Sequence, residues 1–526
     1  MTEPPLSTLS LEQKVGQLFH VGFPETEPTP ALEELICDYH VGGVIYFSRN
    51  LETPEQTRSL SKALQQRALD SGAEIPLLLS VDQEGGTVRR LPYGTDVPGQ
   101  MAVGATETPV NAATVARVTA KQLRDVGINF NLAPVLDVNN NPENPVIGVR
   151  SYSEDAETVA TFGTRYFETL QSESVVACGK HFPGHGDTAT DSHAELPVVD
   201  AHGDRLEEVE LRPFARAIEA GIDAIMTAHV AFPAITGSET KPATLSPAVL
   251  TDLLRDELGF TGVLTTDCME MNAIAETVGT ARGAVEAIAA GADVVLVSHS
   301  PDKQRRAIER VIDAVERGEI AETRIDESVR RILTLKSNRD LQPAPLTESG
   351  SETVITGDDR VALRTISRDA VTLLRGNLDT RPIDPNDQLH LIAPAQTSGS
   401  PAAESQSAGS VLESLFEKRD VDTRLIEIGS ETDLKTAVPT AAQVLCCTAD
   451  VARNPEQATA VEALRAAGHS PVVAALTTPY DCLELSQVEP VLTTYDPTLG
   501  NLTALVDVLL GEQDPRGTPP TSLRSD

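Results

Sequence analysis

The sequence predicts an α/β protein with an N-terminal (β/α)8 TIM-type barrel, followed by a smaller α/β domain with a mostly parallel sheet. Between residue 10 and about 337, short and nearly continuously apolar runs alternate with amphipathic stretches. Such runs are typical of parallel strands that are buried on both faces. Polar residues recur where these runs end, and the alternation resumes after a polar segment near residue 340.

Eight runs are the predicted barrel strands, and no G-x-G-x-x-G follows the first, which favours a barrel over an open doubly wound sheet. Helix-like segments that finish on glycine, a common helix end, lie between them at 53–72, 110–127 and 245–259. The runs are "VGQLFHVGF" (15–23), "VGGVIYF" (41–47), "PLLLSVDQ" (76–83), "INFNLAPVLDV" (128–138), "VVACGKHF" (175–182), "DAIMTAHV" (223–230), "GVLTTDCM" (262–269) and "ADVVLVS" (292–298).

At 526 residues the chain is long enough for two or three domains. We predict a barrel over 1–337, a Ser-, Pro- and Glu-rich linker over 338–352, an α/β domain over 353–512 and a loosely ordered tail over 513–526. The second domain carries no cluster of titratable residues at its strand ends. We therefore expect it to be structural or to flank the substrate.

The charge balance restricts the possible partners. The chain has 78 acidic and 42 basic residues, a formal charge of −36, which argues against nucleic acid or an anionic membrane as partner. Only nine basic residues are lysine, against 33 arginines. We interpret this composition as adaptation to a high-salt cytoplasm, where ions screen repulsion over about 3 Å at 1 M; the alternative is an ordinary acidic enzyme.

The sequence also favours a cytoplasmic location. The N-terminus, "MTEPPLSTLSLEQKVGQ", lacks a basic segment followed by an apolar run, so we expect no signal peptide. No stretch approaches the roughly 20 apolar residues that a membrane helix needs. The six cysteines form no C-x-x-C pair, and reduced thiols without a function are expected. The sequence carries no indication of the oligomeric state.

Charged or titratable residues lie at five of the predicted strand ends, where barrel enzymes carry their chemistry. Because buried charges are uncommon and usually paired, so many of them predict a polar pocket. They are Asp82, Asp137, Lys180 with His181, His229 and Asp267. His229 is either part of the pocket floor or a hydrogen-bonded core residue, and Asp137 either touches ligand or caps a loop.

One stretch, "KHFPGHGDTATDSH" at 180–193, is unusually rich in titratable groups. A metal site, a proton-transfer site and an ordinary polar loop are the competing interpretations. His181 and His185 have a zinc-like spacing, but the intervening turn is not a helix face and no cysteine or glutamate completes the set. We therefore expect no metal and no other cofactor, and we expect His185 to organise the loop.

The same stretch resembles the signature of family 3 glycoside hydrolases, in particular their β-N-acetylglucosaminidase (β-N-acetylhexosaminidase) branch. The resemblance extends, in the family's order, through "VDQEGGTVRRL" (81–91), "NFNLAPVLDVNNNPENPVIGVRSY" (129–152) and "GVLTTDCMEM" (262–271). The second domain resembles, more weakly, the C-terminal domain of many members. This resemblance implies a retaining hydrolase that removes terminal β-linked N-acetylglucosamine.

The resemblance also implies residue roles. Asp267 would be the nucleophile, and Asp191 with His193 would form the acid/base pair; a histidine suits this task because its unperturbed pKa is about 6.5. Substrate-binding positions would be Asp82, Arg150, Lys180 and His181, with His229 added from its strand-end position. Members commonly carry arginine where this chain has Thr87, which puts one contact near the sugar in doubt.

Three alternatives remain open from the sequence. A neutral imidazole would not repel phosphate as a carboxylate would, so the chain could be a family 3 phosphorylase. A family 3 β-glucosidase is disfavoured, because those enzymes lack the Asp-Ser-His loop. A non-catalytic carbohydrate-binding relative is disfavoured because Asp267, Asp191 and His193 are all present.

Overall fold

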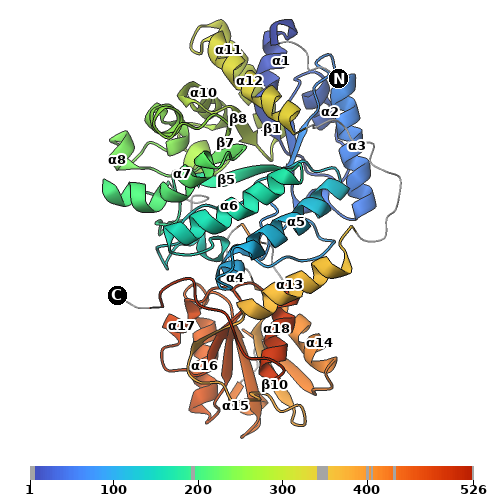
Figure 1. The fold of residues 1–526 in the computed structure, drawn as a ribbon, viewed down its shortest axis with the longest axis vertical. Helices are drawn as coiled ribbons and strands as arrows, with labels where there is room; N and C mark the ends of the chain where they lie inside the picture. The colour runs from blue at the N-terminus through green and yellow to red at the C-terminus, as the bar shows by residue number, and fades with distance from the viewer. Residues whose placement is uncertain are drawn as a thin grey trace.

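The computed structural model describes residues 6–190, 196–339, 354–397, 402–403, 407–429 and 434–523. Within these ranges the chain forms a closed barrel of eight strands and, below it in Figure 1, a separate sheet of six strands. The barrel comes first in the sequence and the sheet second. The predicted fold class is therefore confirmed.

The barrel strands pair in sequence order, and β8 closes the ring against β1 with every pairing parallel. The strands are β1 (Phe19–Val21), β2 (Gly43–Tyr46), β3 (Leu78–Val81), β4 (Phe130–Asn131), β5 (Val176–Phe182), β6 (Ala224–Thr227), β7 (Val263–Cys268) and β8 (Val294–Val297). Each lies within one of the eight runs predicted from the sequence.

Burial explains why the sequences of these strands are nearly continuously apolar. Side chains of a barrel strand face either the barrel interior or the surrounding helices, so both faces are shielded from water. Every residue of β1 to β6 and of β8 is buried. β7 ends on two partly exposed residues, Asp267 and Cys268, at the rim where the strands end.

The strands β1 and β4 fall furthest short of their predicted apolar runs. The first run begins inside helix α1 (Leu11–Gln17), because Ser10 and Gln13 form a capping box that starts a helix at residue 11. β4 stops at Asn131, since Pro134 has no backbone N–H for the ladder. Beyond Asn131 the segment keeps backbone hydrogen bonds to β3 and β5, such as Leu132 N–H to the Val81 carbonyl (2.9 Å) and Cys178 N–H to the Ala133 carbonyl (3.0 Å), and an isolated bridge joins Val135 to Lys180.

Helices cover the barrel and connect its strands (Figure 1). The expected helix over 245–259 is present as a π-helical segment, η6 (Ala248–Glu257). The α-helices of this part are α1, α2 (Pro30–Cys37), α3 (Pro54–Asp70), α4 (Gln100–Gly104), α5 (Val110–Asp125), α6 (Ala156–Ser172), α7 (Arg212–Glu219), α8 (Pro233–Thr236), α9 (Asn272–Ala275), α10 (Thr280–Ala290), α11 (Pro301–Glu316) and α12 (Glu322–Asn338).

The second sheet has the order β11-β10-β12-β13-β14-β9, parallel except for the edge strand β9, which runs antiparallel to β14. Helices α14 and α18 contribute to one hydrophobic core, and α16 to another. The elements are β9 (Thr372–Arg375), β10 (Leu389–Pro394), β11 (Thr423–Ile428), β12 (Gln443–Thr448), β13 (Val472–Ala475), β14 (Val491–Thr493), α13 (Gly357–Ala370), α14 (Ala408–Glu417), α15 (Leu434–Ala437), α16 (Glu456–Ala466), α17 (Asp481–Glu484) and α18 (Leu499–Leu509).

Polar contacts and a small apolar cluster join the two units. The Asp496 carboxylate accepts a hydrogen bond from the Gly99 backbone N–H (2.8 Å), and Asn139 Nδ2 donates to the Tyr480 hydroxyl (2.9 Å). A small apolar cluster contains Met101 of α4, Ala370 at the end of α13 and Tyr495 in the turn after β14. The second unit is therefore seated against the loops that follow β3 and β4.

The segment after α18, expected to be a loosely ordered tail, makes hydrogen bonds to the barrel as far as Ser522, whose hydroxyl donates to Glu154 Oε2 (3.0 Å). The Thr518 N–H donates to the Ala105 carbonyl (2.9 Å), and Ser153 Oγ donates to the Pro520 carbonyl (2.7 Å). The predicted linker, 338–352, lies almost entirely outside the described residues. The borders proposed for the four segments stay predictions.

None of the helices in the described ranges is long and apolar enough to cross a membrane. All six cysteines are free thiols, and Cys178, Cys446, Cys447 and Cys482 are buried.

A buried carboxyl in the second unit yields a stability prediction. Burial raises the pKa of Asp481 to about 7, and nearby Asp450 adds to the effect, while Thr448 Oγ1 and the Val451 N–H donate to its oxygens (2.6 and 2.8 Å). In the unfolded chain this pKa is about 3.9. Between these values the native state keeps a proton that the unfolded state has lost, so the free energy of unfolding should fall as pH rises from about 4 to about 7.

Asp481→Asn should flatten this slope and raise the free energy of unfolding at pH 8 by on the order of a few kcal/mol, since the amide oxygen can accept from the Val451 N–H while the amide NH2 donates to the Thr448 hydroxyl. Far-UV circular dichroism in urea, at several pH values, measures it without needing tryptophan, which the chain lacks. The exposed Asp252→Asn is the matched control and should change nothing. An unchanged slope in Asp481→Asn would contradict the prediction.

Candidate active site

The carboxyl ends of the barrel strands surround a cavity of about 600 Å³. Five of the eight residues proposed for the site line it, namely Asp82, Arg150, Lys180, His181 and Asp267. They come from strands or loops far apart in sequence, and the closed barrel brings their ends together. The volume lies within the range of small-molecule sites.

A buried carboxylate, Glu84, organises the cationic part of this cavity. Glu84 accepts two hydrogen bonds from the Arg150 guanidinium (2.7 and 2.9 Å), and its Oε1 lies 2.7 Å from Lys180 Nζ. Lys180 Nζ also donates to Asp82 Oδ1 (2.7 Å). The side chains of Glu84 and Lys180 are each only 2% exposed, while that of Asp82 is 17% exposed. Asp82 is therefore the most accessible member of this group.

The charges of this group depend on one another. Burial alone would raise the pKa of the Glu84 carboxyl, but Arg150 and Lys180 outweigh it and hold that pKa well below its usual range. Burial likewise works against the charged forms of Arg150 and Lys180. Glu84 raises the pKa of Arg150, and Asp82 and Glu84 raise that of Lys180. Glu84, Arg150 and Lys180 are thus all charged at neutral pH.

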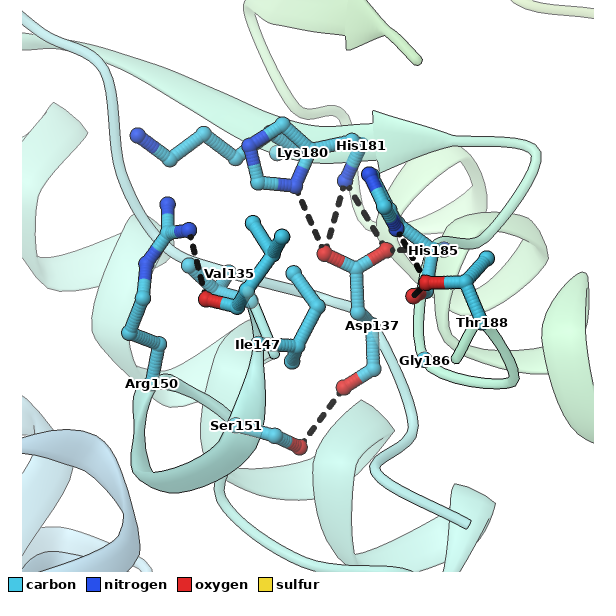
Figure 2. A network of polar contacts seen from close by, with 12 residues as sticks. Val135, Asp137, Ile147, Arg150, Ser151, Lys180, His181, His185, Gly186 and Thr188 are labelled. Carbon is cyan, nitrogen blue, oxygen red and sulfur yellow. Dashed lines mark hydrogen bonds and ion pairs between the residues drawn. The ribbon is translucent and has the colours of Figure 1, made fainter. Parts of the chain in front are cut away.

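A second buried carboxylate, Asp137, holds the histidine-rich stretch in place (Figure 2). Asp137 accepts hydrogen bonds from the His181 N–H (3.1 and 3.2 Å), from His181 Nδ1 (2.7 Å) and from the His185 N–H (2.7 Å). Its own backbone carbonyl accepts from Ser151 Oγ (2.6 Å). Burial opposes ionisation of Asp137, yet His181 and these donors lower its pKa below the usual value.

His185 has a different environment from His181. Its Nδ1 lies 2.9 Å from Thr188 Oγ1, and burial, followed by the charge of His181, lowers the pKa of His185 to about 4. The ring is therefore neutral at pH 7. The carbonyls of His185 and Gly186 both accept from Asn144 Nδ2 (2.8 Å each), so the loop after β4 fixes the turn after β5.

Glycine is required where this turn meets the loop after β4. A Cβ placed on Gly186 would lie 1.7 Å from the Val138 carbonyl oxygen, which no side chain can tolerate. This close approach accompanies the contacts of the Asp137 carboxylate with the backbone N–H groups of His181 and His185.

Asp267 occupies the rim of the cavity at the end of β7. Its Oδ1 accepts from the Cys268 N–H (2.6 Å), and its partial exposure leaves the carboxylate accessible from the cavity. Glu270, which also lines the cavity, accepts from the N–H groups of His299 and Ser300 (2.6 and 3.4 Å). Glu270 is thus bonded to the backbone that follows β8.

His229 does not line the cavity. It is buried, its Nδ1 lies 2.8 Å from Thr244 Oγ1, and its Nε2 lies 3.1 Å from the Cys268 carbonyl, to which it donates. Thr87 is buried and is likewise absent from the lining. Asp191 and His193, the proposed acid/base pair, lie in 191–195, outside the described residues.

Several cavity residues were not predicted from the sequence. Glu84 stands two residues after Asp82, and its position in "VDQEGG" was the available signal. Ala402 and Ala403 come from the second unit, and no local pattern connects them to a pocket in the barrel. Further lining residues that were not predicted include Phe47, Arg49, Arg90, Cys268 and His299.

No group of three or more His, Cys, Asp or Glu side chains is placed to hold a metal ion in the part of the chain that the structure covers. The rings of His181 and His185 meet edge to face with centroids 5.9 Å apart, and their Nδ1 atoms face different oxygens.

Comparison with known proteins gives consistent matches. The family model described as "Glycosyl hydrolase family 3 N terminal domain" matches residues 10–335. "Beta-hexosaminidase A" of Pseudoalteromonas piscicida is 36% identical over 393 residues, which are 69% of this chain and 64%, less than two thirds, of that protein. "Beta-N-acetylglucosaminidase/beta-glucosidase" of Cellulomonas fimi is 29% identical over 77% of this chain and 72% of that protein.

A solved structure matches almost the whole chain. The glycoside hydrolase family 3 β-N-acetylglucosaminidase from Paenibacillus sp. str. FPU-7 has 42% sequence identity and a TM-score of 0.92, and the match covers 98% of this chain and 99% of that one. Both the barrel and the second unit are thus shared with that structure.

The Glu84 group yields a stability prediction. Glu84→Gln leaves the buried Arg150 without a charged partner, and it should lower the free energy of unfolding by about 3 to 5 kcal/mol. Urea denaturation at pH 7 measures the change. The exposed pair Arg212–Glu157 offers a matched control, because Glu157→Gln should change stability by no more than about 1 kcal/mol. Equal effects of the two substitutions would contradict the prediction.

Proposed function

Because the chain belongs to glycosyl hydrolase family 3, we propose that it is a retaining hydrolase that removes terminal β-linked N-acetylglucosamine from small or oligosaccharide substrates. The observation that carries the proposal is the position of Asp267. Its accessible carboxylate shares one cavity with Asp82, Lys180, Arg150 and His181, a set of donors and acceptors suited to sugar hydroxyls. The names of the relatives from Pseudoalteromonas piscicida and Paenibacillus sp. support the acetamido sugar.

In the proposed first step, Asp267 attacks the anomeric carbon while His193 protonates the departing glycosidic oxygen. A covalent glycosyl-enzyme forms and the aglycone leaves with the proton of His193. In the second step neutral His193 takes a proton from water, whose oxygen attacks the anomeric carbon and releases Asp267. Two displacements on the same carbon retain its configuration.

Asp191 would accept a hydrogen bond from the other ring nitrogen of His193, as the aspartate of a catalytic triad does, and so stabilise the protonated imidazole. Asp82, Lys180, Arg150 and His181 would bind the sugar. Charged groups that are already fixed by Glu84 and Asp137 need little rearrangement when the substrate enters, which favours catalysis. We propose that His229 acts indirectly, by fixing the carbonyl of Cys268 beside Asp267.

The acetamido preference and the two catalytic roles are tested together with nitrophenyl β-N-acetylglucosaminide and the matching β-glucoside. Asp267→Ala should reduce kcat on the order of 10⁴-fold or more, as loss of a nucleophile does. His193→Ala should reduce it by on the order of 10² to 10⁴, the usual contribution of general acid/base catalysis. The product's anomeric configuration is read by NMR.

His202→Ala is the matched control for the histidine substitution, because His202 is exposed and pairs only with Asp200 among the described residues. A protein that hydrolyses only the glucoside, or whose activity survives Asp267→Ala, would contradict the proposal. Sugar 1-phosphate formed in added phosphate would identify a phosphorylase instead, and no turnover of any substrate would favour a binding protein.

We also propose that the chain works in a salt-rich cytoplasm. The proposal rests on the formal charge of −36, on the scarcity of lysine and on the free cysteines. Self-repulsion of so many carboxylates destabilises the folded state until salt screens it.

Raising KCl from low to molar concentration should therefore raise the Tm, although the exposed ion pairs of the chain are themselves weakened by salt. Thermal unfolding followed by circular dichroism across a KCl series measures the change. A Tm that stays constant or falls would show that repulsion between carboxylates does not limit the stability of the fold.

A further inference from the structure

Arg49 is a cavity-lining cation that sits apart from the Glu84 group. It follows β2, in the turn Ser48–Asn50, and its side chain is exposed at the cavity. Its Nε donates to the Phe23 carbonyl (3.0 Å) and its Nη2 to the Ser298 carbonyl (3.1 Å). The guanidinium also lies over the Phe47 ring, with its carbon 4.3 Å from the ring centroid. These contacts hold the charge in one place.

The charge of Arg49 has no carboxylate partner. No Asp or Glu oxygen lies within 4.0 Å of its guanidinium nitrogens in the described part of the chain, and its hydrogen-bond acceptors there are two backbone carbonyls and His299 Nδ1. Arg150 and Lys180, by contrast, are paired with Glu84 and Asp82. An unpaired, fixed guanidinium is unexpected in a chain with nearly twice as many acidic as basic residues.

The nearby carboxylate that could have compensated Arg49 is engaged elsewhere. Glu270 accepts from the His299 and Ser300 N–H groups, and its Oε1 lies 3.7 Å from Lys303 Nζ. His299, on the same side, has its ring centroid 5.3 Å from that of Phe47 and its Nδ1 3.4 Å from Arg49 Nη2. The wall formed by Phe47, Arg49 and His299 therefore carries the positive charge of Arg49, while burial lowers the pKa of His299.

The barrel order places this wall away from Lys180 and Arg150, although Asp82 follows β3, which pairs with β2. Arg49 follows β2 and His299 follows β8, which flank β1, whereas Lys180 belongs to β5 and Arg150 to the loop after β4. A ligand held by Lys180 and Arg150 with its anomeric carbon near Asp267 can extend toward Arg49 through the same cavity. We infer that the leaving group occupies this part of the cavity, because Lys180 and Arg150, which would hold the terminal sugar, lie on the other side.

We propose that Arg49 binds an anionic oxygen group on the leaving-group side of the cavity. This proposal rests on the proposed hydrolase function. The favoured source is a carboxylate on the residue next to the scissile bond, because a guanidinium already fixed by carbonyls forms a charge-assisted contact with little loss of side-chain freedom. A free oxyanion such as inorganic phosphate has the same chemistry, and the experiment separates the two sources.

The test compares two disaccharides that differ by one group, β-N-acetylglucosaminyl-(1→4)-glucuronate and β-N-acetylglucosaminyl-(1→4)-glucose, each as the methyl glycoside. At constant ionic strength the wild type should prefer the glucuronate by about tenfold in kcat/KM, as expected for one charge-assisted contact. Arg49→Met should bring the ratio of the two kcat/KM values close to one, and Arg49→Lys should keep part of the preference.

Lys303→Met is the matched control, since it removes one positive charge near the rim from a residue that does not line the cavity. The ratio should stay at the wild-type value. Because each variant is judged by its own ratio of two substrates, partial unfolding of Arg49→Met cannot imitate the result. Equal losses in Arg49→Met and Lys303→Met would indicate a general field effect and overturn the proposal.

Inorganic phosphate added to the neutral disaccharide distinguishes the second source. If phosphate inhibits the wild type but not Arg49→Met, Arg49 binds free oxyanions rather than a carboxylate of the substrate. A wild type that hydrolyses both disaccharides equally and ignores phosphate would overturn the Arg49 proposal while leaving the hydrolase proposal intact. Failure to hydrolyse either disaccharide or the nitrophenyl substrate would instead contradict the hydrolase proposal.

Discussion

The site depends on one buried carboxylate, Glu84, that is bonded to two cations at once. An isolated charge in this position would be strongly destabilising, and Arg150 would lose its ion-pair partner without Glu84, whereas Lys180 would keep Asp82. Together they remain ionised, as the lowered pKa of Glu84 and the raised pKa values of its partners indicate. The group ties the end of β3 to β5 and to the loop after β4, so three barrel segments share one fixed geometry.

Asp137, in the loop after β4, provides a similar restraint on the end of β5 and on the turn that follows it. It binds the backbone of His181 and His185 as well as one imidazole, and it therefore positions the main chain rather than a single side chain. The turn after β5 leads directly into the stretch that carries Asp191 and His193. A fixed starting point for that stretch is what the proposed acid/base pair would need, because proton transfer tolerates little misplacement.

The sequence was sufficient for the barrel because each strand is buried on both faces, and burial leaves a local pattern of continuous apolar residues. It was also sufficient to place Asp82, Lys180, His181 and Asp267 at strand ends that share one cavity. It did not identify Glu84 as the organising charge, because its partners lie 66 and 96 residues away and only the closed ring brings them together. His229 was expected at the pocket by the same strand-end argument, but its ring points to Thr244 and the Cys268 carbonyl instead.

The net negative charge of the chain belongs to its surface, and the cavity lining does not share it. The described cavity lining carries Asp82, Glu84, Asp267 and Glu270 against Arg49, Arg90, Arg150 and Lys180, so the two signs balance there. A net charge of −36 therefore argues against broad anionic partners such as nucleic acid, whose contacts would fall on the surface. It does not argue against a small anionic group, because short-range contact with a fixed guanidinium in a partly enclosed site outweighs a distant field that salt screens. Strong surface acidity and local recognition of an anion are for this reason compatible in one molecule.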